Sequence, residues 1–311
     1  MLIAVTGSNG FIGKALCKVL KKKNFKLRKI QRKKAKDIVQ INNINQETNW
    51  DDTLDSVDVV IHCASIVHDF KNIDFKYYDQ INIKGTLNLF KSSINAGVKK
   101  FIYLSTIKVN GEYTKESMPF SISSKPCPKG NYAISKYKAE KYLIKLAKKE
   151  KIDLIIIRPP LVYGPEVKAN FLNLMKVTSR GIPLPFLGLK NKRSFIFIGN
   201  LVDIICNCIL NPKAIGKTLL VADRKPIDIV YFFEILYKEF GYKSRLFYVP
   251  SLILNFIFYI LKKTNQLFTI KSSLEIDFEE FASIINWKPL FTFEEGMKLT
   301  IHWFKTKRLK F

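Results

Sequence analysis

The chain has 311 residues and a mass of 36.0 kDa, enough for about two domains. Hydrophobic residues make up 47% and charged residues 25%, close to the averages for globular chains, which excludes disorder, collagen-like repeats and a small disulfide-stapled fold. Fifty-two basic against 26 acidic residues give a net charge of +26. Such a field attracts nucleic acid, anionic membranes or phosphorylated substrates, but the lysines are spread along the whole chain, which favours an ordinary lysine-rich surface.

Several simple signals bear on compartment and partners. Five cysteines with no C-x-x-C pair indicate a reducing compartment, and the chain begins with a strand-like run at residues 2–5 rather than a secretion signal, so we expect a cytoplasmic protein. No basic helix is interleaved with stacking aromatics, so nucleic acid is not an expected partner. The histidines, His62, His68 and His302, are too few and scattered for a metal site, and no metal is expected.

Short apolar runs alternate with longer helical patterns in the first half of the chain. This alternation predicts an α/β fold, a Rossmann-like doubly wound parallel sheet with helices on both faces. The run at 57–63 is continuously apolar, as expected for a strand buried on both faces. Strands are predicted at 2–5, 25–30, 38–41, 57–63, 101–104, 154–157 and 195–198, and helices up to about 23 and over about 78–96 and 132–149.

The pattern becomes irregular after residue 160, where Gly, Pro and Asn cluster. We expect a first domain over residues 1–163 and a smaller α/β domain over 164–311, with residues 191–212 returning to the first. Asn200 is expected to cap a helix.

One segment of the second half is unusually apolar. The thirteen residues 249–261 are too few for a bilayer span, which needs about 20. The favoured interpretation is a helix packed on the core. The alternative is an interfacial helix at a membrane, helped by the basic surface.

A glycine-rich loop follows the first predicted strand. Gly7 permits a tight turn, Gly10 lets a pyrophosphate approach the backbone, and Gly13 lets the helix sit close to the sheet. This strand–turn–helix context predicts a first domain that binds NAD or NADP. Arg32 follows the second strand with no acidic residue beside it, which favours NADP because a basic residue accepts a 2′-phosphate; the alternative is a solvated surface charge.

A second motif supplies an acid/base group. Tyr132 and Lys136 lie four residues apart, on one face of a predicted helix. A free phenol has a pKa of about 10, and a nearby ammonium lowers it, so Tyr132 can exchange a proton with a substrate hydroxyl or carbonyl. Ser105 and Thr106 end the fifth strand, where a hydroxyl would point at the top of the sheet.

These motifs together carry a family resemblance over essentially the full length. The chain resembles extended short-chain dehydrogenases/reductases of the NAD-dependent epimerase/dehydratase family, and most closely the bacterial surface-polysaccharide enzymes that act as UDP-hexose 4-epimerases or 4-keto-6-deoxy-sugar reductases. The motifs are TGSNGFIG (6–13), HCAS (62–65), NIKGT (82–86), LSTIKVNGE (104–112), YAISK (132–136), RPPLVYGP (158–165) and NKRSF (191–195).

The resemblance implies a role for each motif residue. Tyr132 would be the acid/base, Lys136 would hold the nicotinamide ribose, and Thr106 with Ser105 beside it would bond the C4 oxygen of the sugar. Asn170 and Arg193 would hold the substrate diphosphate, which makes residues 164–311 the substrate domain. The implied cofactor contacts are Gly7, Asn9, Gly10, Phe11, Ile12, Gly13, Arg32, Asn43, Ala64, Asn82, Lys136 and Pro159.

The chain departs from the family pattern in two places. Asn42-Asn43 stands where the family often has Gly-Asp, so the adenine contact would pass to an amide. No arginine precedes Asp277 closely, where typical epimerases carry a second diphosphate ligand.

The resemblance implies hydride transfer at C4 of a UDP-hexose. We expect a UDP-glucose or UDP-N-acetylglucosamine 4-epimerase of bacterial surface polysaccharide synthesis, acting as a homodimer through the helices after strands four and five. The first alternative is an NADPH-dependent reductase of a 4-keto-6-deoxy sugar, favoured by Arg32. A further alternative is an epimerase of a lipid-linked sugar diphosphate, which would associate peripherally with a membrane; the sequence does not favour this association. The last alternative is a non-catalytic NAD(P)-binding protein.

Overall fold

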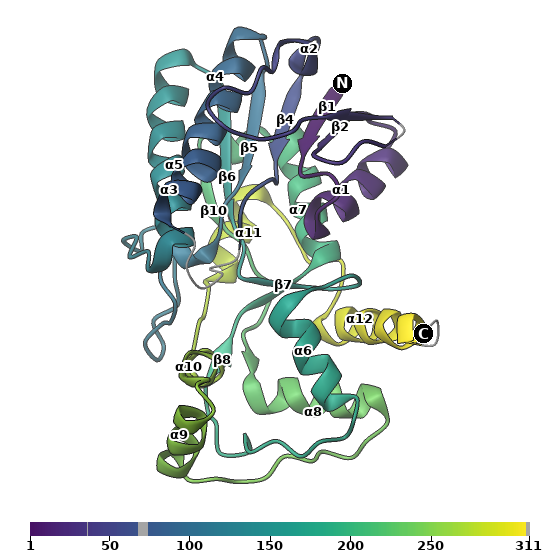
Figure 1. The fold of residues 1–311 in the computed structure, drawn as a ribbon, viewed down its shortest axis with the longest axis vertical. Coiled ribbons are helices and arrows are strands. Elements are labelled where there is room, and N and C mark those ends of the chain that lie inside the picture. The colour runs from purple at the N-terminus through teal and green to yellow at the C-terminus, as the bar shows by residue number, and fades with distance from the viewer. Residues whose placement is uncertain (36, 68–73, 309–311) are drawn as a thin grey trace.

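A seven-stranded sheet forms the centre of the computed structural model, which describes residues 1–35, 37–67 and 74–308. All its strands are parallel, in the order β10-β6-β5-β4-β1-β2-β3 (Figure 1). The predicted Rossmann-like doubly wound sheet is therefore confirmed. The strands are β1 (Leu2–Thr6), β2 (Lys26–Gln31), β3 (Ile38–Gln40), β4 (Val59–His62), β5 (Lys100–Leu104), β6 (Asp153–Arg158) and β10 (Thr218–Leu220).

Helices cover both faces of this sheet (Figure 1). One face carries α1 (Phe11–Lys22) and α7 (Ile198–Leu210), which pack against each other. The strand order reverses between β1 and β4, and such a switch point is where open parallel sheets bind ligands. The other face carries α2 (Asp51–Leu54), α3 (Phe75–Tyr78), the π-helix η1 (Asp79–Gly85), α4 (Thr86–Asn95) and α5 (Gly130–Glu150).

Most of the remaining elements gather beyond the carboxyl ends of the strands (Figure 1). Short strands form two pairs there, β7 (Leu161–Tyr163) with β9 (Phe195–Phe197) and β8 (Lys192–Arg193) with β11 (Ile227–Asp228). The 3-10 turns are η2 (Ile107–Val109) and η3 (Pro212–Ala214). The helices are α6 (Ala169–Thr178), α8 (Ile229–Phe240), α9 (Ser251–Ile260), α10 (Thr264–Lys271), α11 (Phe278–Ile285) and α12 (Phe293–Arg308).

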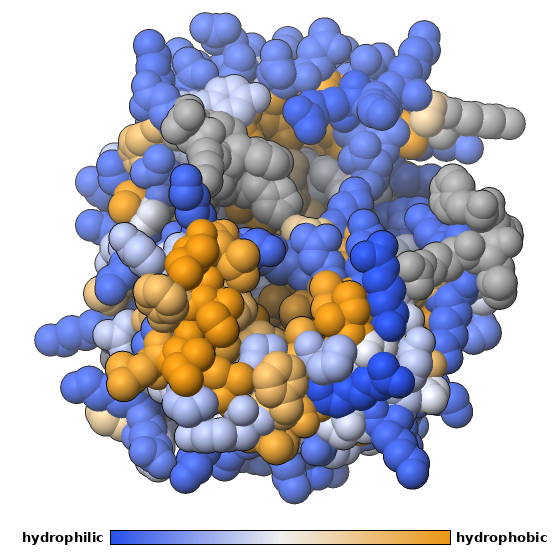
Figure 2. Space-filling view, turned by 60° about the horizontal axis from the view of Figure 1, so that its bottom comes forward, coloured by the Kyte–Doolittle hydropathy of each residue, from blue (hydrophilic) through white to orange (hydrophobic). Residues whose placement is uncertain are grey.

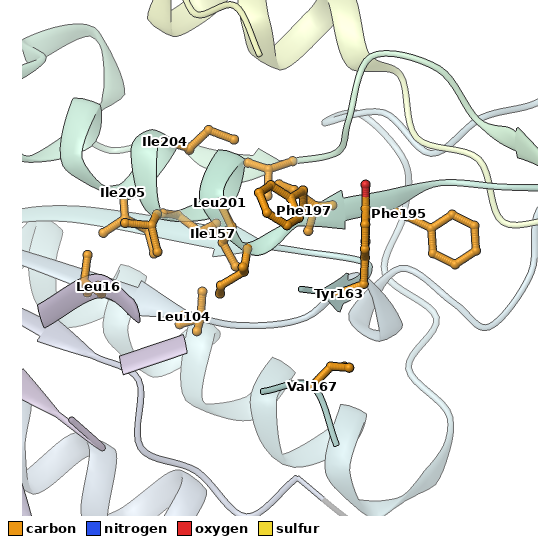
Figure 3. Packing of buried hydrophobic residues seen from close by; sticks show 14 of the residues in the cluster. Leu16, Leu104, Ile157, Tyr163, Val167, Phe195, Phe197, Leu201, Ile204 and Ile205 are labelled. Carbon is orange, nitrogen blue, oxygen red and sulfur yellow. The ribbon is translucent and has the colours of Figure 1, made fainter. Parts of the chain in front are cut away.

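The two faces of the sheet bury separate apolar cores. Leu89, Phe101 and Leu143 belong to the core under α4 and α5. The second core runs from α1 and α7 across the sheet to the later elements, so both halves of the chain share it (Figure 3). The residues labelled in Figure 3 are Leu16, Leu104, Ile157, Tyr163, Val167, Phe195, Phe197, Leu201, Ile204 and Ile205.

Asn200 lies inside α7, which begins at Ile198, so its expected capping role is wrong. Its side chain is fully buried: Nδ2 donates to Asp223 Oδ1 at 2.7 Å and to the Phe291 carbonyl at 2.9 Å, and Oδ1 accepts from the Leu290 and Phe291 amides. Burial raises the pKa of Asp223 to about 6, against the effect of the hydrogen bonds it accepts. Asn200 therefore links α7 to Asp223, which follows β10, and to residues 290–291, which precede α12.

The segment 249–261 forms α9, which packs on the core as expected through Leu254 and Phe258 but leaves most of its apolar side chains uncovered. Of the ten residues of α9, Leu254 is buried and Phe258 is half-buried, and the other eight are exposed. No helix in the described part of the chain is long and apolar enough to cross a membrane.

Replacing Asn200 tests this buried junction. Asn200→Ala leaves the Leu290 and Phe291 amides and one carboxylate oxygen of Asp223, Oδ1, without their partner, so we expect the free energy of unfolding to fall by about 3 kcal/mol in urea denaturation. Asn207→Ala on the same helix is the matched control, because Asn207 bonds the Asn211 side chain in a half-buried position; its effect should stay within about 1 kcal/mol. Equal effects of the two substitutions would contradict this reading.

Candidate active site

The loop between β1 and α1 closes tightly on itself. Gly7 has φ +66°, and a Cβ there would lie 2.9 Å from the Ala64 amide nitrogen. A Cβ at Gly13 would lie 2.2 Å from the Gly7 carbonyl oxygen, whereas one at Gly10 would meet that oxygen at 3.1 Å and no other atom within 4 Å. The Gly10 amide donates to the same carbonyl, and Gly10 directly precedes α1. The free amides of the first turn of α1, which include those of Phe11 and Ile12, form a helix N-terminus that can bind an anion. The loop therefore fits a dinucleotide pyrophosphate.

A cavity of about 450 Å³ opens beside this loop, between α1 and β2. Asn9 lines it, while Arg32 is exposed just beyond β2 and is not among the lining residues. Asn43 is also exposed, in the loop after β3, where its carbonyl accepts from the Thr48 hydroxyl at 2.8 Å. The cationic lining residues, which sequence reasoning missed, are Lys14, Lys18, Lys21 and Lys29.

The end of β4 adjoins the glycine loop through a buried histidine. His62 Nδ1 lies 2.7 Å from the Thr6 hydroxyl, and Nε2 lies 3.0 Å from the Thr86 hydroxyl. Burial, and then the charge of Lys136, lower the pKa of His62 to about 3, so it is neutral at pH 7. The Ala64 amide donates to the same Thr6 hydroxyl at 3.3 Å. His62 therefore fixes Ala64 against the glycine loop without adding charge.

Asn82 holds the loop that follows β4. Its Oδ1 accepts from the Ile66 amide at 2.9 Å, and its Nδ2 donates to the Ile66 carbonyl and to the Ser135 hydroxyl. Ser135 lies in α5, between Tyr132 and Lys136. Asn82 thus ties the β4 loop to the helix that carries the predicted acid/base.

Tyr132 and Lys136 are both buried on α5, one turn apart. The Lys136 ammonium lies 4.0 Å from the ring centroid of Tyr103, a residue of β5. Burial lowers the pKa of Lys136 to about 7, while the Glu140 carboxylate one turn further along opposes that shift. Burial, with the Glu140 and Tyr132 charges, raises the pKa of Tyr103 well above its usual value, so Tyr103 stays neutral. The structure thus keeps one ionisable amine beside two phenols.

A buried ion pair anchors Glu140. The Arg158 guanidinium donates through Nε to Glu140 Oε1 at 3.0 Å and through Nη2 to Oε2, and its Nη1 donates to Asn110 Oδ1 at 2.9 Å. Sequence reasoning missed this network, although Glu140 follows Lys136 at the helical i+4 spacing that would have indicated a shared face. The network joins α5, β6 and the turn after η2.

Ser105 and Thr106 lie at the carboxyl end of β5, as predicted. The Ser105 amide donates to the Ile157 carbonyl at 2.7 Å, and its buried hydroxyl has no hydrogen-bond partner among the described residues. Thr106 is 9% exposed, and its hydroxyl accepts from the Lys108 amide at 3.3 Å. The Ile107 amide binds the Pro159 carbonyl, which holds this turn beside the end of β6. A buried hydroxyl without a partner suits a ligand oxygen.

The two predicted diphosphate ligands lie on later elements. Asn170 is exposed in the first turn of α6. Arg193, in β8, donates from Nη1 to the Thr269 and Ser272 carbonyls at 2.8 and 2.7 Å, at the end of α10. Burial lowers the pKa of Arg193 to about 10, which leaves it cationic at neutral pH. The described contacts therefore link Arg193 to α10 and not to α5.

No metal centre is evident in residues 1–35, 37–67 and 74–308, where no three His, Cys, Asp or Glu side chains gather closely enough to hold an ion. His68, considered above as a ligand, lies outside these described residues.

Comparisons with known proteins agree with this arrangement. The sequence profile of the NAD dependent epimerase/dehydratase family matches residues 3–222. A Vibrio cholerae protein named UDP-glucose 4-epimerase is 38% identical over 307 residues, an alignment covering 96% of this chain and 94% of that protein. The chain belongs to the NAD-dependent epimerase/dehydratase family. Because this family binds NAD(P), the predicted cofactor class is confirmed.

More distant proteins share parts of this similarity. The Escherichia coli O157:H7 protein named N-acetyl-alpha-D-glucosaminyl-diphospho-ditrans,octacis-undecaprenol 4-epimerase is 26% identical over 211 residues, covering 65% of this chain and 61% of that protein. The crystal structure of UDP-glucuronic acid 4-epimerase from Bacillus cereus in complex with NAD has a TM-score of 0.79 and 22% identity, with 98% of this chain and 97% of that chain covered. The latter likeness shows the fold.

Two glycine substitutions separate packing from cofactor binding. Gly13→Ala drives a Cβ into the Gly7 carbonyl, so we expect it to lower the free energy of unfolding by about 1–3 kcal/mol. Gly10→Ala meets that oxygen at a tolerable distance, so stability should fall less, while NAD affinity falls at least about tenfold because the Cβ occupies the pyrophosphate approach. Thermal denaturation and calorimetric NAD titration measure the two effects; a Gly13→Ala protein as stable as the wild type would refute the contact.

Proposed function

We propose that the protein is a UDP-hexose 4-epimerase that acts on UDP-glucose or UDP-N-acetylglucosamine in bacterial surface polysaccharide synthesis. The observation that carries the proposal is the buried amine of Lys136, one turn from Tyr132 and close to Cys63 after β4 and to Tyr103 of β5. The 38% identity to a UDP-glucose 4-epimerase across 96% of the chain supports the substrate class.

The residues divide the reaction between them. NAD, when bound over the glycine loop, supplies the acceptor and donor of the C4 hydride. The Tyr132 phenolate takes the proton of the C4 hydroxyl and returns it once the keto sugar has turned its other face, which is general acid–base catalysis. Ser105 and Thr106 hydroxyls hold the C4 oxygen. Asn170 and Arg193 hold the diphosphate, for which a planar guanidinium is well suited.

Lys136 is useful to Tyr132 only while it is protonated. A cation near the phenol stabilises the phenolate, whereas a neutral amine does not. The Glu140 carboxylate favours the ammonium form of Lys136, and the Arg158 and Asn110 hydrogen bonds fix that carboxylate. We therefore assign Glu140 as a positioning residue that acts through Lys136.

The runner-up function is an NADPH-dependent 4-keto-sugar reductase. The lysine-lined cavity beside the glycine loop favours it, because four amines there suit a 2′-phosphate. Arg32 is exposed just beyond β2, next in sequence to the lining residue Gln31, and carries the same charge. Both candidate reactions move a hydride at C4 and use the same acid/base residues.

We also propose a homodimer through α4 and α5. Tyr142 and Ile144 on α5 are 51% and 37% exposed, so this helix carries apolar side chains on its solvent side. Lys136 and Tyr132 lie on the opposite, buried side of the same helix.

Proton NMR of the purified protein with UDP-glucose or UDP-N-acetylglucosamine, and no added cofactor, tests the function. We expect the C4-epimerised sugar to accumulate, because a bound cofactor returns its own hydride. Tyr132→Phe removes the acid/base and should slow this reaction by about 10²–10⁴-fold. Tyr77→Phe, at a 46% exposed phenol on α3, is the matched control and should match the wild type. No epimerisation, together with NADPH-dependent reduction of a 4-keto sugar, would replace the epimerase by the reductase.

A further inference from the structure

The outer end of the second half exposes an unusual number of large apolar side chains. In α9 the exposed fractions reach 84% for Leu252, 63% for Phe256 and 71% for Tyr259. Figure 2 shows hydrophobic residues gathered at the lower left, the side on which α9 lies in Figure 1. We define the α9 surface by its exposed apolar members: Phe247, Tyr248, Leu252, Ile253, Phe256, Ile257, Tyr259, Ile260, Leu261 and Phe268.

This exposure differs from the scattered apolar residues of an ordinary surface. Leu252, Ile253, Phe256, Ile257 and Ile260 all lie on one helix of ten residues. A contiguous exposed patch of this kind marks a protein or membrane contact. Since the helix is apolar around most of its circumference and contributes little to the core, its sequence is better explained by a partner than by the stability of the fold.

The sequence on either side of α9 carries charge of one sign. From Phe240 to Leu274 the sequence contains no Asp or Glu but five basic residues. Lys262 and Lys263 directly follow the apolar run and are exposed. The others are Lys243, Arg245 and Lys271.

The apolar side chains of α9, flanked in sequence by basic residues alone, match one partner above others. A second copy would bring equal positive charges together, because a two-fold contact places the same patch on both sides. An anionic bilayer offers acyl chains to the apolar side chains and headgroup phosphates to the lysines. The helix is too short to span a bilayer, so it must lie in the interface.

We propose that the α9 surface docks this protein on anionic membranes. α9 lies in the plane of the headgroups with Leu252 and Phe256 inserted, and Lys262 and Lys263 bind lipid phosphates.

Docking there bears on the substrate side of the molecule. Arg193, the proposed diphosphate ligand, holds the Thr269 and Ser272 carbonyls at the end of α10, the helix that follows α9. A membrane-docked α9 therefore keeps the diphosphate region near the bilayer surface. The docking itself rests on the α9 surface alone and holds whichever C4 reaction the site performs.

Vesicle flotation of the full-length protein tests the proposal. We expect it to float with phosphatidylglycerol-containing vesicles, to float less with pure phosphatidylcholine, and to be released by added salt. Leu252→Glu/Phe256→Glu should lower the bound fraction at least about tenfold. Lys262→Glu/Lys263→Glu should lose the preference for phosphatidylglycerol.

Controls separate docking from folding and self-association. Leu210→Glu, at a 65% exposed leucine that ends α7, should float like the wild type, and every variant should keep the wild-type melting temperature and turnover of UDP-sugars in solution. Failure of the wild type to float, or flotation unchanged in Leu252→Glu/Phe256→Glu, would overturn the proposal. A dimer that this double variant converts to monomers, without flotation of the wild type, would assign the α9 surface to contact between copies instead.

Discussion

A lysine amine almost wholly removed from water is the constraint on which the proposed active site depends. Burial alone makes Lys136 a poor cation, and its pKa falls to about 7. Glu140, held by Arg158, supplies the opposing negative charge within the same helix face. Breaking such a buried pair leaves an uncompensated charge, which is strongly destabilising, so this network links the stability of α5 and β6 to the protonation of Lys136.

The strand ends at the switch point of the sheet also carry little charge. His62 is kept neutral by burial and held by two threonine hydroxyls, so the strand ends beside the glycine loop contribute shape rather than charge. Lys136 is a buried cation one turn from Tyr132 on α5, while other cations gather at the lysine-lined cavity beside α1. This separation suits a cofactor whose phosphates lie apart from its reacting carbon.

The sequence pattern predicted much of the first half of the chain, because residue spacing and apolar runs there agree with the fold that forms. The glycine loop and the strands β1, β2, β4, β5 and β6 follow from spacing and apolar runs, each within a residue or two of its observed bounds. The short strand β10 was missed, since three residues carry no period and pairing with β6 decides it. Residues 79–85 form a π-helix where an ordinary helix was expected, and Asn82 there binds the loop after β4.

Tertiary contacts explain the other differences. Asn200 is a residue type that often caps helices, but here its side-chain amide binds Asp223 and the backbone at Phe291 instead. α9 has the composition of a core helix, and only the folded chain shows that the core meets it at Leu254 and Phe258 and leaves its other side chains exposed. Arg158 and Glu140, eighteen residues apart, become partners only when β6 packs under α5.

The most direct test of the proposed mechanism follows a deuterium label at C4 of the sugar. UDP-glucose deuterated at C4 is given to the purified protein without added cofactor, and the product is analysed by NMR. If Tyr132 exchanges only the hydroxyl proton while the C4 hydride is removed and returned within one site, the epimerised sugar keeps its deuterium at C4 even in ordinary water. Loss of the deuterium to solvent, or turnover only with NADPH supplied, would contradict the proposed mechanism.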